Sequence, residues 1–148
     1  MLCMKSKLNN HDNQKTFALV FDAGDEVISL LTDFAQQQNL HASQFTAIGA
    51  FEKATLGYFN ISIKDYKKIE VNEQVEVLSV TGDIAMNENK PQIHAHVVLG
   101  KSDASTVGGH LLKAIVKPTL EVILTESPSY LNKKMNKEFD LPLIDLTQ

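Results

Sequence analysis

The chain has 148 residues, 43% of them hydrophobic and 22% charged, so it is long enough for one domain with a buried core and too apolar for wholesale disorder. Its formal net charge is -4, and all 14 basic residues are lysines. Arginine is the preferred reader of guanine edges, because its planar guanidinium donates two hydrogen bonds at once. The composition therefore argues against a protein that reads a DNA sequence unaided.

The cysteine content and the hydropathy of the chain indicate in which cellular compartment the protein is expected. Cys3 is the single cysteine, which excludes an internal disulfide framework and a zinc module built from several cysteines. No apolar run approaches the roughly 20 residues that span a bilayer. The first 15 residues also lack the apolar core of a signal peptide. A cytoplasmic protein without a membrane partner is expected.

The N-terminal part of the chain predicts a tail, a strand and a helix. Residues 1–15 are polar and without periodicity, and we expect a flexible tail ahead of a single domain at 16–148. Residues 16–21 form a short strand-prone run. Apolar residues then recur at helical spacing between 27 and 35, with Asp22 or Asp25 as the expected N-cap and Asn39 as the expected end.

Strand-prone segments dominate the rest of the chain. Residues 87–90 ahead of Pro91 predict a hairpin connection, residues 128–138 a helical or irregular segment, and residues 141–144 a last edge strand. One helix followed by many strands predicts an α+β fold of two layers, in which the helix covers one face of a mainly antiparallel sheet. The other expected strands lie at 44–51, 53–63, 66–71, 74–86, 91–99 and 119–126.

The most informative pattern is a pair of histidines in the strand-prone segment 91–100. His94 and His96 are two residues apart, so a strand places both on one face. His110 follows two glycines, whose backbone can bend or approach another strand closely. Three neutral imidazoles suit Zn²⁺ or a similar divalent transition metal and leave a fourth position open for water or substrate.

Each candidate residue also has a purely structural interpretation. His94 and His96 can instead be two half-buried histidines that form hydrogen bonds with neighbouring side chains. Glu121 lies among apolar strand residues, where it can orient a histidine or act as a general base, or simply face solvent. Cys3, His11 and His41 lie in the tail or at the helix exit, and no catalytic role is expected for them. The sequence has neither a phosphate-binding loop nor a GxGxxG motif.

An ordered series of segments resembles the plants and prokaryotes conserved domain, or PPC domain. The resemblance covers residues 16–126, and its specificity lies in the order of the segments rather than in any one of them. The segments are IGAF at 48–51, ATLGYF at 54–59, VEVLSVTGDI at 75–84, HAHVVLG at 94–100, GGHL at 108–111 and PTLE at 118–121.

The resemblance implies a strongly bent antiparallel sheet with one packed helix, assembled as a homotrimer. It also implies a stand-alone prokaryotic member, a type described as a candidate DNA-binding protein, and a metal held by His94, His96 and His110. The chain departs from the plant members, which carry Arg-Gly-Arg-Pro AT-hooks and usually an arginine where this sequence has Gln74. These departures weigh against direct DNA binding.

Three functional hypotheses follow. The first is a homotrimeric binding or regulatory module. The second is a metal-dependent enzyme that acts on a small oxygenated substrate, because the histidine pattern resembles the zinc site of acetolactate decarboxylase. In that case a lysine such as Lys53 or Lys101 would have to anchor a substrate carboxylate, since no arginine is present. The third hypothesis is a sensor that binds a small molecule in a cleft between trimer subunits, without turnover.

Overall fold

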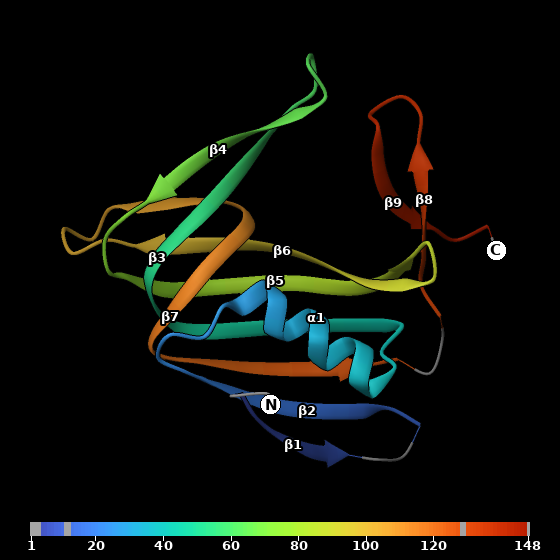
Figure 1. Cartoon of the computed structure of the whole chain (residues 1–148), viewed down its shortest axis with the longest axis horizontal. Coiled ribbons are helices and arrows are strands. Elements are labelled where there is room, and N and C mark those ends of the chain that lie inside the picture. Colours follow the sequence, from blue (N-terminus) through green and yellow to red (C-terminus); the bar gives the residue numbers. More distant parts are fainter. Residues whose placement is uncertain (1–3, 11–12, 128–129, 148) are drawn as a thin grey trace.

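The structure is a computed structural model and describes residues 4–10, 13–127 and 130–147. Within these residues the chain forms nine strands and one helix (Figure 1). The elements are β1 (Lys5–Asn10), β2 (Lys15–Asp22), α1 (Val27–Gln38), β3 (Ala42–Asn60), β4 (Asp65–Val71), β5 (Val75–Asn87), β6 (Lys90–Gly100), β7 (Thr106–Glu126), β8 (Asn132–Asn136) and β9 (Leu141–Asp145).

Two long bent strands, β3 and β7, organise the sheet. Strand β3 pairs with β5, β5 with β6, β6 with β7 and β7 with β3, so these four strands close a ring. The other strands extend the sheet outward, and all pairings are antiparallel except one parallel contact between β5 and β8. The predicted mainly antiparallel sheet is confirmed. The ring matters for function because it brings β6 and the beginning of β7 side by side.

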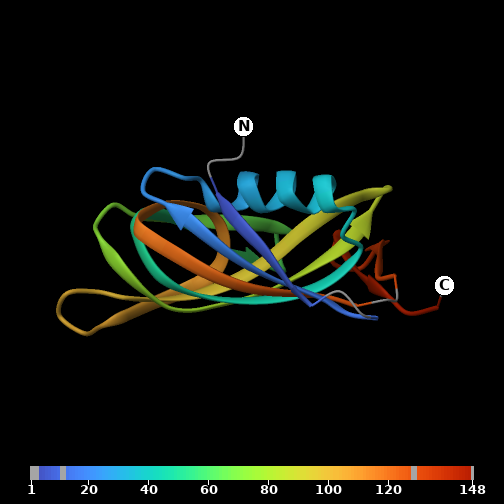
Figure 2. The same cartoon turned by 90° about the horizontal axis from the view of Figure 1, so that it is seen from below.

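Helix α1 lies across one face of the sheet, as Figure 2 shows. The residues that the helix buries are Val27, Leu31, Phe34 and Ala35, which recur at helical spacing. They join strand residues such as Phe21 and Leu120 in one hydrophobic core, while the opposite helix face is polar. The two-layer α+β arrangement expected from the sequence is thus confirmed.

The ends of the helix correct one detail of the sequence prediction. The N-cap is Glu26, whose carboxylate accepts hydrogen bonds from two backbone N–H groups of the first turn. Neither Asp22 nor Asp25 has this role, because the Asp25 carboxylate instead accepts a bond from the backbone N–H of Asp22. Glu26 also accepts the backbone N–H of Ala114 and so ties the helix to β7. The predicted end at Asn39 is confirmed, with φ at 53°.

The structure has more strand residues than the sequence predicted, in three segments. Residues 5–10, within the predicted tail, form β1 and pair with β2, whereas residues 1–3 and 11–12 lie outside the described part of the chain. Residues 132–136 form a strand rather than a helix and pair with β9 as a C-terminal hairpin. Strand β7 begins at Thr106, well before the predicted start at 119. In each case tertiary pairing overrides weak local propensity.

Among the described residues, no helix has the length and the apolar stretch that crossing a membrane requires.

Candidate metal centre

A two-residue turn between β5 and β6 sets the position of the first two histidines. Glu88 and Asn89 both have positive φ, at 49° and 61°, which is typical of the type I′ turns that connect tight hairpins. The register that follows places His94 opposite Asp83 and His96 opposite Thr81. Directly opposite residues point to the same side of an antiparallel pair, so Asp83 and both histidines share one face.

Two glycines allow β7 to bring the third histidine to this face. Gly108 and Gly109 run between β6 and β3, so closely that a Cβ atom at Gly108 would lie 2.8 Å from the carbonyl oxygen of Val97. A Cβ atom at Gly109 would lie 2.9 Å from the carbonyl oxygen of Gly57. Only glycine fits this approach without a shift of the backbone. The next residue, His110, pairs directly with His96 across β6 and β7.

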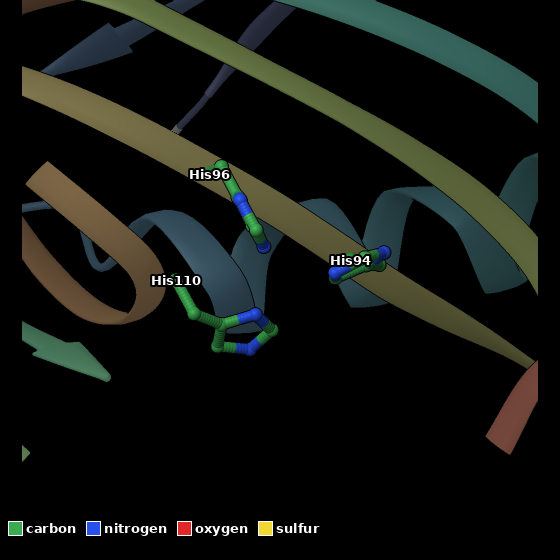
Figure 3. Close-up of side chains that lie close together, drawn as sticks. All are labelled: His94, His96 and His110. Carbon is green, nitrogen blue, oxygen red and sulfur yellow. The ribbon is translucent and has the colours of Figure 1, made fainter. Parts of the chain in front are cut away.

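The three imidazole rings form one cluster, in which two rings project from β6 and the third from β7 (Figure 3). Each of His94, His96 and His110 offers a ring nitrogen, and these three nitrogens lie within 4.8 Å of one another. The ring centroids are 5.1 to 5.5 Å apart. The histidines that the sequence singled out are thus brought together by two strands of the ring.

A carboxylate, Asp83, contacts the histidine cluster, and a lysine, Lys133, lies close to that carboxylate. The Nδ1 atom of His94 lies 3.3 Å from Oδ2 of Asp83, and the Nζ atom of Lys133 lies 3.6 Å from Oδ1 of the same carboxylate. Partial burial acts to raise the pKa of Asp83, but the bond to His94 and the charge of Lys133 outweigh it and leave the pKa below its ordinary value. Asp83 therefore stays ionised, and its contact with Nδ1 orients the His94 ring so that Nε2 is the nitrogen left for a metal.

Burial keeps the other two rings neutral. Burial, reinforced by the nearby His94, His96 and Lys133, lowers the pKa of His110 from 6.5 to about 4. Burial and the neighbouring His94 also lower the pKa of His96, although Asp83 acts in the opposite direction. Neutral imidazoles are the form that binds a metal, and His110 is in that form at pH 7.

The residues fit a divalent transition metal on the chemistry of their donors. The Nδ1 atom of His110 is buried and has no hydrogen-bond partner among the described residues. A buried polar atom without a partner is costly, and an ion bound at Nδ1 would remove that cost. A tetrahedral ion with bonds of about 2.0–2.1 Å holds its ligand atoms roughly 3.3 Å apart, so the three nitrogens would draw together slightly on binding.

The cluster opens into a cavity of about 610 Å³, which we call the histidine cavity. The sheet contributes the three histidines, Asp83 and Gln92, while β3 and β4 add Phe59 and Tyr66. The other wall is the C-terminal hairpin of β8 and β9. That hairpin contributes Lys133, Leu141, Pro142, Leu143 and Ile144.

Other residues considered from the sequence lie away from this cavity. Glu121 is exposed on the part of β7 that pairs with β2, opposite Val20. His41 stacks on Tyr130, with ring centroids 4.5 Å apart. Cys3 and His11 lie outside the described residues. None of the described residues in this group lines the histidine cavity.

The two lysines considered as anchors for a carboxylate are also elsewhere. Lys101 pairs with Glu73 at 2.7 Å, and Lys53 borders a separate hollow between β3, β4 and β7. The charged residues that do border the cluster, Asp83 and Lys133, were not singled out from the sequence. For Asp83 a signal existed, because counting back from the predicted turn at 87–90 pairs it with His94. For Lys133 no local pattern predicts contact with a residue fifty positions earlier.

The model of the Plants and Prokaryotes Conserved (PCC, also written PPC) domain matches residues 9–128. Comparison with curated proteins gave no match.

Solved structures share the fold over nearly the full length. A metal-containing protein from Archaeoglobus fulgidus is 31% identical with a TM-score of 0.82, and 97% of this chain and 99% of that chain are covered. A plant- and prokaryote-conserved protein from Pyrococcus horikoshii is 25% identical with a TM-score of 0.84, covering 97% and 96%. A candidate DNA-binding protein from Bacteroides thetaiotaomicron has a TM-score of 0.89 at 24% identity, covering 97% and 99%. This chain therefore belongs to the plants and prokaryotes conserved domain family.

Proposed function

We propose that the protein is a metal-binding module that holds a divalent transition metal, Zn²⁺ in the first instance, through His94, His96 and His110. The observation that carries the proposal is the convergence of three ring nitrogens within 4.8 Å from two different strands. A relative that is 31% identical is described as metal-containing, which supports the same assignment. Imidazole is a ligand that suits zinc, copper, iron and nickel, so the donor set favours this class of metals over Mg²⁺ or Ca²⁺.

The chain's own residues define what the centre can do. Three neutral histidines leave the double positive charge of the ion uncompensated and leave a coordination position for a further ligand. Asp83 holds the His94 ring through Nδ1, and Gly108 and Gly109 hold the backbone of His110 close to β6. A bound Zn²⁺ would supply Lewis-acid chemistry to a ligand in the histidine cavity.

Metal content of untagged protein tests this proposal. The wild type, incubated with zinc and then dialysed, should hold about one zinc per chain by elemental analysis. The double variant His94→Ala/His96→Ala should hold almost none, because one imidazole alone cannot retain the ion. His41→Ala is the matched control, since His41 stacks on Tyr130 away from the cavity and should leave the metal content unchanged. Equal zinc in the double variant and the wild type would contradict the proposal.

We propose further that the protein is a homotrimer that serves as a binding or regulatory module. The family resemblance supports trimer formation, and so does an apolar patch on the outer face of the sheet. Ile48 on β3 and Ile123 on β7 are 61% and 51% exposed. Thr46, two residues from Ile48, pairs with Ile123, so both isoleucines point to the same face. Paired exposed isoleucines of this kind favour contact with another copy.

Direct binding of duplex DNA is the weaker candidate. Relatives from Bacteroides thetaiotaomicron and Ralstonia eutropha are described as candidate DNA-binding proteins, the second at 29% identity over 88% of this chain and 90% of that chain. This chain has a net charge of -4 and no arginine. Phosphate contacts would depend on lysine alone and would weaken steeply with salt. We expect no retardation of a duplex in gel-shift experiments even at low salt, and salt-sensitive binding would contradict this.

The histidine cavity favours a small-molecule ligand as a second element of the function, whether the protein is a sensor or an enzyme. Gln92 lines the cavity, and its Oε1 atom is buried without a hydrogen-bond partner among the described residues. Buried polar atoms of this kind are normally satisfied. This unpaired atom beside the three histidines supports a site that takes up a polar ligand together with the metal.

A further inference from the structure

The wall of the histidine cavity that faces the metal ligands is the C-terminal hairpin, residues 132–145. It lies beyond the family match, which ends at residue 128. Strand β8 touches the main sheet through one parallel contact, between Asn132 and Met86. The hairpin brings a lysine and several apolar side chains to the cavity. Apart from the three histidines, five of the ten residues that line the cavity come from this hairpin.

With a divalent metal bound, the charges that line the cavity favour an anionic ligand. Among the described residues that line it, Lys133 is the one lysine and Asp83 the one carboxylate, so their formal charges cancel. Histidines bind a metal as neutral ligands and add no charge. A divalent ion at the histidines would then leave the cavity with two positive charges. An anion that enters would neutralise part of this charge, and a neutral or cationic ligand would not.

Lys133 is placed to meet such an anion. Its side chain is only 5% exposed, although lysine is almost never buried without a partner. Its ammonium lies 3.6 Å from Asp83 Oδ1, longer than the roughly 2.7–3.2 Å of a good hydrogen bond. An ammonium has three donors, so this distant pair leaves donors for a ligand. Lys133 also lies near enough to the cluster for its charge to lower the pKa of His110, after burial and the other two histidines.

Apolar side chains make up most of the remaining lining, beside Tyr66 and Gln92. From the hairpin come Leu141, Pro142 and Ile144, and from the sheet come Phe59 and Ile93. A small inorganic anion would leave this surface in contact with water. An organic anion with a hydrocarbon body would cover it, and burial of that body would favour binding. A cavity of about 610 Å³ is in the usual range for small organic ligands.

We propose that the histidine cavity binds a small aliphatic carboxylate, whose carboxylate group faces the metal and Lys133 and whose hydrocarbon body packs on the C-terminal hairpin. The inference rests on the proposed metal centre and names the ligand class that this centre takes. Asp83 has two roles in this arrangement, because it holds His94 through Oδ2 and balances Lys133 through Oδ1. Lys133 is a ligand-binding residue rather than a metal ligand.

Cobalt-loaded protein provides the test, because the visible spectrum of Co²⁺ changes when a ligand enters its open position. The probes are isovalerate and isovaleramide, which share a hydrocarbon body but differ in charge. The wild type should bind isovalerate and should bind isovaleramide at least 10-fold more weakly. Lys133→Met keeps most of the side-chain volume and removes the charge, and it should weaken isovalerate binding by about 10-fold or more.

Two further variants control for folding. Lys134→Met removes the adjacent lysine, whose side chain is 71% exposed and lies near Asp145, and should leave isovalerate binding unchanged. Lys133→Arg restores the positive charge and should recover most of the binding. Cobalt affinity within about threefold of the wild type shows that the Lys133→Met protein is folded. If that variant does not fold, the proposal can still be tested with the wild type and Lys133→Arg. Both proteins should bind isovalerate more tightly than isovaleramide, and equal binding of the two probes would contradict the proposal.

The outcomes separate the two proposals. If the wild type fails to bind cobalt, the metal centre and the ligand site are both wrong. If it binds cobalt but isovalerate leaves the spectrum unchanged, the metal centre stands and the ligand site is wrong. The ligand site is also wrong if isovaleramide binds as tightly as isovalerate, or if a folded Lys133→Met variant binds isovalerate like the wild type.

Discussion

Asp83 connects the two functional parts of the cavity, because one carboxylate contacts both His94 and Lys133. A carboxylate that accepts the Nδ1 proton of a metal-binding histidine fixes its tautomer and makes its Nε2 a better donor. Lys133 was the least visible of these groups in the sequence, since no local pattern links it to a strand fifty positions earlier, whereas the predicted turn at 87–90 pairs Asp83 with His94. His94 and His96, by contrast, were singled out by their spacing on a strand, and His110 by the two glycines before it and by the family resemblance.

The first prediction concerns Asp83→Asn. The variant removes the negative charge but keeps the size of the side chain, and we expect zinc affinity to fall about 10-fold to 100-fold. Competition with a chromophoric chelator measures the affinity. Asp103→Asn is the control, because Asp103 is exposed in the loop between β6 and β7 and caps Ser105 there. Equal affinities for the wild type and Asp83→Asn would show that Asp83 does not support the centre.

The second prediction concerns the pH dependence of the metal-free protein. Burial, with His94, His96 and Lys133 nearby, lowers the pKa of His110 to about 4, below the ordinary 6.5. The unfolded chain therefore takes up a proton between pH 6.5 and 4 while folded His110 stays neutral. The stability present above pH 6.5 is lost as the pH falls through this window. Solvent screening at this partly exposed site reduces the effect, and we expect about 1–2 kcal/mol.

Urea unfolding of chelator-treated protein at a series of pH values measures this change. The fall between pH 6.5 and 4 should be smaller in His110→Gln, because glutamine does not titrate. Below this window the depressed pKa of Asp83 acts in the same direction, since protonation of that carboxylate favours the unfolded chain. A free energy of unfolding that is equally pH-dependent in the wild type and His110→Gln would contradict the account.

At the scale of elements, the β5–β6 hairpin was predictable and the rest of the cavity was not. The polar stretch at 87–90 fixes a two-residue turn, and that turn fixes the register that places His94 opposite Asp83. The approach of β7 was only hinted at by Gly108 and Gly109, because close approach is a property of the neighbouring strand as well. Strand β8 is held in place by its hairpin partner β9 and by its contact with β5. No local sequence pattern signals this position, so residues 132–136 were expected to be helical or irregular.

The third prediction follows from the turn itself. Glu88 has a left-handed backbone with φ at 49°, which costs a residue with a side chain roughly 1 kcal/mol, whereas Asn-Gly is the preferred pair for such a turn. The double variant Glu88→Asn/Asn89→Gly should raise the free energy of unfolding by about 1 kcal/mol, measured by chemical denaturation. Zinc affinity should remain unchanged, because the register of β6 is preserved. A loss of stability would indicate a different turn geometry.

For the whole molecule, the negative charge opposes binding to DNA, whereas the exposed apolar surface favours association with other copies of the chain. Three copies of a chain with a net charge of -4 carry about -12 in a trimer, which opposes association with DNA. The exposed isoleucines of the sheet favour association with further copies instead. The family assignment followed from an ordered series of short segments, whereas the oligomeric state depends on surfaces that no single sequence pattern describes.

The fourth prediction addresses this surface. Light scattering should give a mass of about 49 kDa for the wild type, three times the 16.4 kDa of one chain. Ile48→Lys/Ile123→Lys should shift the protein toward a single chain, because buried unpaired lysines oppose the contact. Leu146→Lys, a substitution at a residue that is 80% exposed near the C-terminus, is the control and should remain trimeric. A monomeric wild type, or a trimeric double variant, would contradict the proposed interface.

Anomalous diffraction from crystals of zinc-loaded protein, collected on both sides of the zinc absorption edge, would show where the metal binds. We expect one anomalous peak per chain, bonded to nitrogen atoms of His94, His96 and His110, with a fourth ligand on the side of the cavity that holds Lys133. Zinc bound at other residues, or no peak at these three histidines after zinc loading, would contradict the proposed metal centre.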